Sequence, residues 1–450
     1  MSTVGRYGTQ WRGPGSGTPR WRGSIFPVAM LVVLSTCACS SMVQHDSAPP
    51  VGLIATTTPW AGSFNSVDLP LPVNSITSVS CPTKSSCWAT GSTEGGGGNA
   101  LGAAILATRN GGATWTPESI PNTIGYLSSI SCRDASHCVA VGETTTALGM
   151  EGVALVTSDG GRVWAGPPPI AGTTDITAVT CGPSGGCLAV ASGSSGAVAV
   201  TLEPDGTWQT VGPLPPGTSG ATDVSCADDE HCWVTGATTV GADNIVGSVA
   251  YTTDFGATWT AVPVPPGTGM LNGLSCSSSA KSAGSLPFGA TSTTVPPAGT
   301  TTTGSAPGAP SGAPSTTVVP PTTTTTLPGV PGFDCTAVGT TSTTLDAPRA
   351  GHGLILRTTS GGSTWTAERV PATAASFTDI SCPTAGSCAA VGTSVATAPE
   401  AGLVVLTGDG NIWKHAATVA VPQPVAAVSC ASVGHCVMAG EAVSEWLDAS

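Results

Sequence analysis

The chain has 450 residues, of which 60 are Gly and 38 are Pro; only 9% are charged, and the formal net charge is −13. This mixture is poor in helix formers and rich in turn formers, so it favours an all-β fold over a helical one. Phosphate binding draws its affinity from Lys and Arg, and these number 13 against 26 acidic residues, which argues against a nucleic-acid partner.

The N-terminal segment predicts export. Residues 1–36 contain four arginines, no acid and the apolar run IFPVAMLVVL, which is too short to span a bilayer as an ordinary helix. The following LSTCACSS resembles a bacterial lipoprotein cleavage site, which implies a lipid-modified Cys37 as the first mature residue. The alternative is plain secretion, with Cys37 and Cys39 discarded or paired with each other. We expect a signal peptide over 1–36, a linker over 37–50, and a location on the outer face of the cell membrane or in the medium.

A cysteine phrase recurs along the rest of the chain. SCPTKSSC begins at 80, SCRDASHC at 131, SCADDEHC at 225, SCPTAGSC at 381 and SCASVGHC at 429, and the successive first cysteines are 51, 49, 45, 50, 106 and 48 residues apart. The 16 cysteines divide into two at the lipoprotein-like site and one pair in each of seven repeats. The predicted pairs are Cys81–Cys87, Cys132–Cys138, Cys181–Cys187, Cys226–Cys232, Cys276–Cys335, Cys382–Cys388 and Cys430–Cys436.

Disulfides and zinc are the two interpretations of these cysteines. In an exported protein, an even number of cysteines with each pair closing one hairpin indicates disulfides. Zinc needs four ligands per site, whereas only three of the phrases contain a histidine, at His137, His231 and His435. We therefore expect disulfides, no metal and no cofactor. Each bridge across so short a loop should stabilise the fold by about 2 kcal/mol in the chain-entropy model.

Each repeat predicts four short strands. In the second repeat LSSISC ends at Cys132, CVAVG begins at Cys138, GVALVT follows, and a turn leads to a fourth strand at Trp164. The turns TRNGGATW, TSDGGRVW, TTDFGATW and TTSGGSTW, with the shorter LEPDGTW and TGDGNIW, resemble the Asp-box, or BNR repeat, of sialidases and related β-propellers. In such a turn Asp or Asn accepts backbone N–H bonds, Gly supplies a positive φ and Trp packs between sheets, so the motif marks a fold rather than catalysis. The structural residues of the motif are Asn110, Trp115, Asp159, Trp164, Asp205, Trp208, Asp254, Trp259, Trp365, Asp409 and Trp413.

Seven repeats of four strands predict an all-β fold, a seven-bladed β-propeller over residues 51–445. The last repeat lacks its turn, whereas GLIATTTPW at 52–60 matches GLILRTTSGGSTW at 353–365 apart from a shortened turn. The N-terminal segment is therefore expected to supply the outer two strands of the last blade and close the ring, which removes exposed strand edges. Residues 277–333, rich in Thr, Pro, Gly and Ser, are predicted to form a disordered insertion within blade five.

The alternation of strand direction assigns the loops to two rims. The cysteine hairpins, the Asp-boxes and the insertion are expected on one rim. The blade connections and the loops between second and third strands are expected on the other, where propellers of this kind usually bind ligands. Loops on that second rim include GETTTALGMEG at 142–152 and GATTVGADNIVG at 236–247.

Asp223 and Asp379 are weak candidates for catalytic carboxylates. They occupy the same position in the innermost strands of the fourth and sixth blades, so we expect a separation of about 10 Å or more, at or beyond the spacing of inverting glycosidase pairs. The alternative is that each bonds backbone groups at a strand start. Sialidases use three arginines, a tyrosine with a glutamate, and an aspartate. Here the propeller holds only Tyr126 and Tyr251, and its arginines lie mostly beside Asp-box turns, so the resemblance covers the repeats and not the active site.

Two classes of function remain open. The first is a non-catalytic binding or scaffold propeller for an envelope protein or a glycan, similar in outline to the Asp-box propellers that assist photosystem II assembly. The second is a glycoside hydrolase, sialidase-like or glucanase-like, or a lectin-like sugar binder. Such hydrolases need an aromatic platform, and the tryptophans outside the turns are Trp88, Trp233 and Trp446. The missing catalytic residues favour the first class, in a monomer that meets the membrane only through its lipid anchor.

Overall fold

The computed structural model describes residues 69–440 with several gaps, together with 63–64 and 447–448. The gaps are 71, 94–101, 148, 195, 204–205, 219, 241–243, 279–331, 342–351, 396–400, 408–412 and 416–423. The predicted signal peptide and linker, Cys37, Cys39, the strand segment 52–60, Asp205, Asp409 and Trp446 lie outside the described residues.

The described elements are β-strands that form six larger sheets and a smaller seventh, numbered here as blades 1–7 in chain order. Blade 1 holds β2 (Val73–Ser80), β3 (Cys87–Thr93), β4 (Gly102–Thr108) and β5 (Thr116–Pro117), and blade 2 holds β6 (Tyr126–Cys132), β7 (Cys138–Thr146) and β8 (Gly149–Thr157). Blade 3 holds β9 (Thr173–Cys181), β10 (Cys187–Gly193), β11 (Gly196–Leu202) and β12 (Trp208–Pro213), and blade 4 holds β13 (Gly220–Cys226), β14 (Cys232–Val240), β15 (Asn244–Thr252) and β16 (Thr260–Val262). Blade 5 holds β17 (Leu271–Ser278), β18 (Phe333–Thr340), β19 (Gly353–Thr358) and β20 (Thr366–Ala367), blade 6 holds β21 (Ala374–Thr384), β22 (Ser387–Ser394), β23 (Ala401–Thr407) and β24 (Lys414–His415), and blade 7 holds β25 (Val425–Ser432) and β26 (His435–Gly440).

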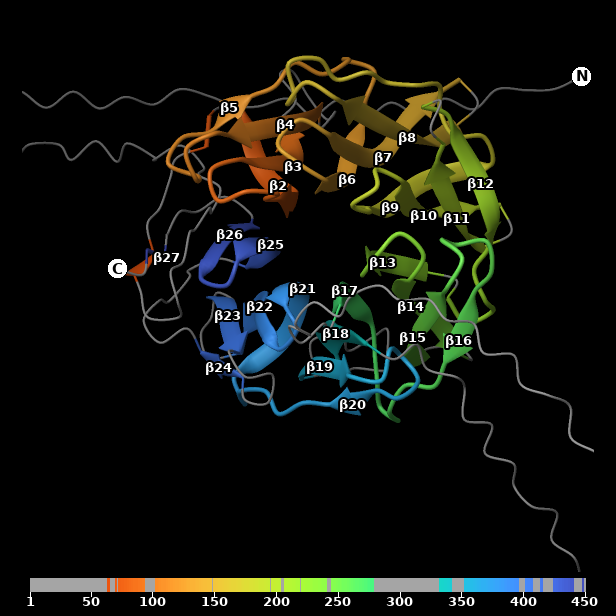
Figure 1. Ribbon diagram of the computed structural model, residues 1–450, viewed down its shortest axis with the longest axis vertical. Helices are drawn as coiled ribbons and strands as arrows, with labels where there is room; N and C mark the ends of the chain where they lie inside the picture. Colours follow the sequence, from red (N-terminus) through yellow and green to blue (C-terminus); the bar gives the residue numbers. More distant parts are fainter. Residues whose placement is uncertain are drawn as a thin grey trace, which may run out of the picture. The chain divides into compact units, whose positions relative to one another are not determined.

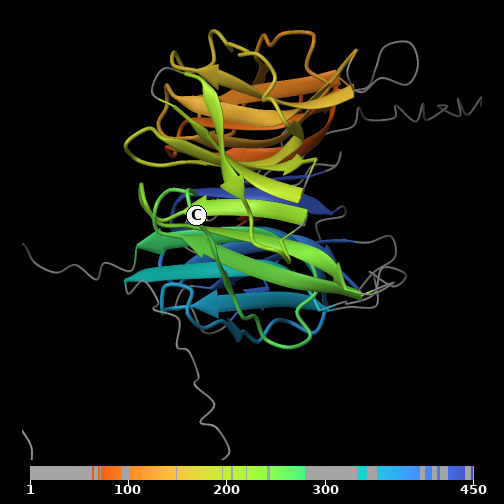
Figure 2. The same cartoon turned by 90° about the vertical axis from the view of Figure 1, so that its right-hand side faces the viewer.

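In each of these seven blades the sheet is antiparallel, and strands consecutive in the chain are neighbours. The sheets stand around a common axis, with the first strand of each blade innermost (Figure 1). Seen from the side, the sheets stack one on another around the ring (Figure 2). The chain is therefore an all-β propeller, as the repeat spacing predicted. Within the described residues, no helix is long and apolar enough to cross a membrane.

The apolar core lies between the blades rather than inside any one of them. Six clusters of buried side chains each join neighbouring blades, and the largest joins blades 6, 7 and 1. The second and third strands are buried on both faces, which explains why they are built from small apolar residues, as in CVAVG of β7 and GVALVT of β8. Alternating bulk lets the wedge-shaped sheets fit together.

A ring of hydrogen bonds fixes the innermost strands to one another. In six junctions the serine before the first cysteine of one blade accepts the N–H of the equivalent cysteine in the next blade. Ser80 bonds Cys132 at 2.9 Å in this way, and Ser429 of blade 7 bonds Cys81 of blade 1 at 2.9 Å. The last of these bonds closes the inner ring across residues far apart in the chain.

The seven predicted disulfides are present, one in each blade. Six join cysteines six positions apart, and Cys276–Cys335 joins β17 to β18 across a separation of 59 residues. Both strands extend beyond this bridge, because Ser277 pairs with Asp334 and Ser278 with Phe333. The outermost residues of the predicted insertion thus form strand, and 279–331 lie outside the described residues.

The two ends of the propeller segment come together. β1 (Ser63–Phe64) pairs antiparallel with β27 (Leu447–Asp448) as a separate two-stranded sheet. Blade 7 itself shows two strands among the described residues. Completion of that blade by residues 52–60 remains a prediction.

Candidate functional site

Asp223 and Asp379 line a narrow cavity on the axis of the ring. Asp223 lies on β13 of blade 4 and Asp379 on β21 of blade 6, each three positions before the first cysteine of its blade. The cavity has a volume of about 130 Å³. All seven innermost strands contribute to its wall, mostly with small polar residues: Thr77, Ser78, Ser128, Ser129, Thr177, Ala178, Thr222, Asn272, Thr378 and Ala426. The two carboxylates therefore line the same open cavity.

Each carboxylate joins its own blade to the next one. Asp379 Oδ1 accepts the N–H of Ile380 at 2.7 Å, and its Oδ2 accepts the N–H of Val428 in blade 7 at 2.7 Å. Asp223 bonds in the same way to its own strand at 2.8 Å and to the N–H of Leu274 in blade 5 at 2.7 Å. Both oxygens of each side chain thus hold backbone groups, which matches the alternative that sequence reasoning had weighed against catalysis.

Burial raises the pKa of both carboxyl groups. Each carboxyl group is partly accessible from the axial cavity but is otherwise surrounded by protein. The loss of hydration raises the pKa of Asp379 to about 6, although its two N–H donors act to lower this pKa. At Asp223, burial and the nearby charge of Asp379 raise the pKa well above its ordinary value. Gly273 of blade 5 stands between the two, and a Cβ there would lie 2.9 Å from the Cα of Asp379. The pair therefore interacts through space across one blade.

The cavity offers little room for a sugar. Its volume of about 130 Å³ compares with about 300–1,000 Å³ for typical ligand pockets. An inverting glycosidase pair must hold both a sugar and a water between its carboxyl groups. The arrangement of Asp223 and Asp379 therefore fits attachment between blades better than hydrolysis.

The Asp-box turns hold themselves together through local hydrogen bonds. Asp159 Oδ1 accepts the N–H of Val163 at 3.0 Å and the hydroxyl of Thr157 at 2.9 Å, while Thr157 Oγ1 accepts the N–H of Gly161 at 3.0 Å. These bonds, chiefly the one from Val163, lower the pKa of Asp159. Asn110 and Asp254 make the equivalent bonds in their turns, and Ser360 takes this position in blade 5. The turn tryptophans Trp115, Trp164, Trp365 and Trp413 are buried, and Trp208 and Trp259 are partly buried.

Two tryptophans outside the turns lie between blades. Trp88 and Trp233 follow the second cysteines of blades 1 and 4 and are 1% and 0% exposed. A Cβ on Gly161 of the blade 2 turn would lie 3.0 Å from Trp88 Nε1, and a Cβ on Gly362 of the blade 5 turn would lie 2.4 Å from Trp233 Nε1. Each indole therefore packs on the Asp-box glycine of the next blade. Sequence reasoning missed this contact, because the glycine and the tryptophan belong to different blades and no local pattern links them.

The arginines near the Asp-boxes are engaged within the scaffold. Arg109 Nη2 donates to Glu118 at 3.2 Å and to the carbonyl of Gly160 at 2.6 Å. Arg357 Nη2 pairs with Asp334 at 3.1 Å. These arginines join neighbouring segments on the rim of the cysteines and do not gather as a carboxylate-binding triad.

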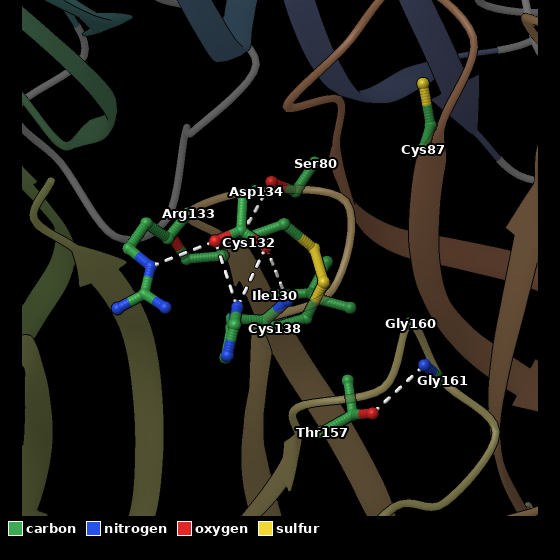
Figure 3. The surroundings of a disulfide bond; sticks show 12 residues. Ser80, Cys87, Ile130, Cys132, Arg133, Asp134, Cys138, Thr157, Gly160 and Gly161 are labelled. Atoms are coloured by element: carbon green, nitrogen blue, oxygen red, sulfur yellow. Dashed lines mark hydrogen bonds and ion pairs between the residues drawn. A yellow bond between two sulfur atoms is a disulfide. The ribbon is translucent and has the colours of Figure 1, made fainter. Parts of the chain in front are cut away.

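Two histidines of the cysteine phrases, His137 and His231, contact an aspartate of the same hairpin, whereas His435 Nδ1 lies 3.4 Å from Ser432 Oγ. Asp134 Oδ1 accepts the N–H of Ser136 at 2.7 Å and lies 2.9 Å from His137 Nδ1, and Asp228 and His231 repeat the arrangement. Figure 3 shows Asp134 beside the Cys132–Cys138 disulfide, with Arg133 on its other side. Although burial acts to raise it, hydrogen bonds from these partners lower the pKa of Asp134. Among the described residues, no three side chains of His, Cys, Asp or Glu form a metal-binding group.

The rim that carries the cysteine hairpins and the Asp-box turns is called here the disulfide rim. A cavity of about 520 Å³ opens on this rim between blades 3 and 4. Arg133, Glu203, Asp229 and Phe255 are among its lining residues, so charges of both signs face it. Phe255 adopts a φ of 54° at the turn position where Gly111, Gly160 and Gly361 stand in other blades, a conformation that costs a bulky residue about 1–3 kcal/mol. Because charges of both signs line this cavity, its lining does not indicate one class of ligand.

The opposite rim, called here the connection rim, gathers exposed apolar side chains. Six large apolar residues of the described chain are exposed, by 37–64%, and five of them stand at the connection rim: Tyr126, Met150, Val240, Val246 and Val395. The sixth is Val163, in an Asp-box turn of the disulfide rim. A cavity of about 410 Å³ lies on the connection rim between blades 3 and 4, lined by Thr177, Ser192, Gly220, Ala221, Thr222, Ala237, Thr238, Thr239, Ile245 and Met270. It shares Thr177 and Thr222 with the axial cavity, so the two spaces adjoin.

The comparisons with known proteins found remote similarities among solved structures only. No protein-family model and no curated protein matches the sequence. The solved structure "YCF48 bound to D1 peptide" is 14% identical, with 87% of this chain and 97% of that chain covered and a TM-score of 0.49. A Hadza microbial sialidase is 11% identical over 82% of this chain and 66% of that one, with a TM-score of 0.42. A GH74 xyloglucanase from Xanthomonas campestris is 11% identical over 83% of this chain and 47% of that one, with a TM-score of 0.41.

These solved structures include both a peptide-bound protein and enzymes. At identities of 11–14% and TM-scores of 0.41–0.49, these similarities assign no function to this chain.

Proposed function

We propose that this chain is a non-catalytic binding propeller that recognises an envelope protein or a glycan outside the cytoplasm. The observation that carries the proposal is the placement of exposed apolar side chains, five of six on the connection rim. An exposed side chain such as Met150, 52% accessible, adds nothing to the fold where it stands, and apolar groups gathered on one face are typical of interaction surfaces.

The carboxylates and tryptophans support binding over hydrolysis. The carboxylate oxygens of Asp223 and Asp379 accept backbone N–H groups of adjacent blades. Trp88 and Trp233 are buried between blades and are not exposed for stacking against a sugar. The alternative function, a sialidase-like or glucanase-like hydrolase or a lectin-like sugar binder, would need other side chains for these tasks.

The proposal includes the finer features of architecture and location. Seven disulfides favour an oxidising compartment outside the cytoplasm. Within it, the chain is proposed to be held at the cell membrane by a lipid on Cys37 and to act as a monomer. Residues 52–60 are proposed to complete blade 7, so that a seven-bladed ring is closed by both chain ends; the pairing of β1 with β27 supports this.

Site-specific photo-crosslinking tests the proposed function. A photoreactive amino acid at position 150 or 240 of the mature protein, irradiated with envelope material of the producing cell, is expected to give a discrete adduct. The same amino acid at position 163, which is more exposed (64% against 52% for Met150 and Val240) but lies on the disulfide rim, is the control and is expected to give none.

Activity assays test the alternative. The purified protein is incubated with aryl sialosides, aryl β-glucosides and β-glucan, beside the variants Asp223→Asn and Asp379→Asn. We expect no turnover above background. Turnover that disappears in either variant would replace the binding proposal with the hydrolase.

A further inference from the structure

The hairpins of blades 2, 3 and 4 reach different heights on the connection rim. Strands β7, β8, β14 and β15 have nine residues each, whereas β10 and β11 of blade 3 have seven. The strands β7, β10 and β14 all start at the second cysteine of their blade, so the two extra residues extend toward the connection rim. At 3.3 Å per residue, the hairpins of blades 2 and 4 therefore rise about 7 Å above the hairpin of blade 3.

This height difference makes a groove whose floor is blade 3. The wall on the blade 2 side carries Met150, and the wall on the blade 4 side carries Val240 and Val246, which are 52%, 52% and 37% exposed. The strands of the floor end in glycine, because β10 ends at Gly193 and β11 begins at Gly196. The 410 Å³ cavity opens beside this floor at the foot of the blade 4 wall.

The charges that face the groove are negative. Glu143 of β7 shares the face of Val141, which packs against blade 3, and Asp175 lies on β9 of blade 3 itself. Burial raises the pKa of Glu143, and the charge of Asp175 adds to this effect, which places the two carboxyl groups near each other. Asp175 pairs across the sheet with Ser192, a lining residue of the cavity, so the negative charge adjoins that space.

No positive side chain of these blades balances that charge. Between residues 126 and 270 the only Lys or Arg residues are Arg133 and Arg162, and both belong to hairpins of the disulfide rim. Met150, Val240 and Val246 are not aromatic, and Tyr126, which pairs across the sheet with Glu143, is the one exposed aromatic side chain among the described residues of blades 2, 3 and 4 at this rim. A ligand that complements the groove is therefore apolar along its length and positive where it meets the carboxylates.

We infer that the groove over blade 3 docks a polypeptide segment in which lysine or arginine stands beside apolar residues. This inference rests on the proposed binding function and names the place and the class of partner. The apolar side chains of the segment pack against Met150 and Val240, and a long cationic side chain enters the cavity, with its charge toward Asp175. The fit uses the apolar stem of Lys or Arg as well as its charge.

Selection from a random library tests the inference without a known partner. Twelve-residue peptides displayed on phage are selected on the mature protein, after depletion on a variant with both Met150→Asp and Val240→Asp. We expect enriched peptides that combine Lys or Arg with apolar residues. Enrichment of acidic peptides, or no enrichment at all, overturns the inference.

Synthetic copies of the selected peptides then locate the site by fluorescence anisotropy. Met150→Ser and Asp175→Asn are each expected to weaken binding by about tenfold. Val163→Ser, at the exposed valine of the disulfide rim, is the matched control and should leave the affinity unchanged. Thermal melts of all variants confirm that they fold, since the substituted side chains lie at the surface.

The outcomes separate the inference from the function on which it rests. Peptides that bind equally well to the groove variants show recognition at another surface, which overturns the groove and leaves the binding function standing. Glycan-array binding that is lost with Met150→Ser replaces the polypeptide with a sugar. The absence of photo-adducts together with hydrolytic turnover rejects the proposed function itself.

Discussion

Replacement of Asp379 should remove part of the pH dependence of stability. In the folded protein burial raises the pKa of this carboxyl group to about 6, whereas its ordinary value is 3.8. The folded state therefore binds the proton more tightly than the unfolded state does. The resulting stabilisation is fully present below the unfolded pKa and is lost as the pH rises through about 6. A difference of about two pKa units corresponds to about 3 kcal/mol.

The assay is urea unfolding of the mature protein at intervals from pH 4 to pH 8. Other buried carboxyl groups, Asp223 above all, contribute slopes of the same sign, so the informative quantity is the difference between the wild type and Asp379→Asn. That difference should change by about 3 kcal/mol across the window, in favour of the variant at the higher pH. Asp379→Ser provides a second variant, because Ser78 and Ser129 already accept a neighbouring N–H at the same position of blades 1 and 2.

Asp254→Asn serves as the opposite control. Although burial acts to raise it, hydrogen bonds from Thr258 and Thr252 lower the pKa of Asp254, so its stabilisation is lost as the pH falls rather than as it rises. Parallel stability curves for the wild type and both Asp379 variants between pH 4 and pH 8 would refute the reasoning, because they would mean that this carboxyl group ionises alike in the folded and unfolded states.

Two further predictions concern the scaffold. Gly362→Ala places a Cβ 2.4 Å from the Nε1 atom of the fully buried Trp233 at a φ of +91°, so urea unfolding should show a loss of about 2–4 kcal/mol. Gly149→Ala, at a φ of +122° with open space around it, carries the backbone strain alone and should cost less; equal losses would contradict the packing argument. Replacing Cys276 and Cys335 together by Ser should cost about 4 kcal/mol, against about 2 kcal/mol for a short-loop pair, because the bridge spans 59 residues. Thermal melts with equal losses for both kinds of pair would show that chain entropy does not set the difference.

The sequence by itself determined the repeating unit. A cysteine pair with five residues between its members closes a hairpin within one stretch of chain, and an Asp-box bonds to its own backbone, so both signals are local and could be recognised without coordinates. Their spacing of about fifty residues fixed the number of repeats and therefore the class of fold. The longer spacing of 106 residues between the first cysteines of blades 5 and 6 could also be explained, because Cys276 and Cys335 remain paired across the insertion.

Only the tertiary structure decided what the individual polar and aromatic residues do. Asp379 accepts a hydrogen bond from the N–H of Val428, 49 positions away, and Trp233 packs against Gly362 in the next blade. Such partners meet only when neighbouring blades pack, and no local pattern distinguishes a carboxylate that holds a blade from one that attacks a substrate. The groove over blade 3 arises in the same way, because a difference of two residues in strand length becomes a surface only when three hairpins stand side by side.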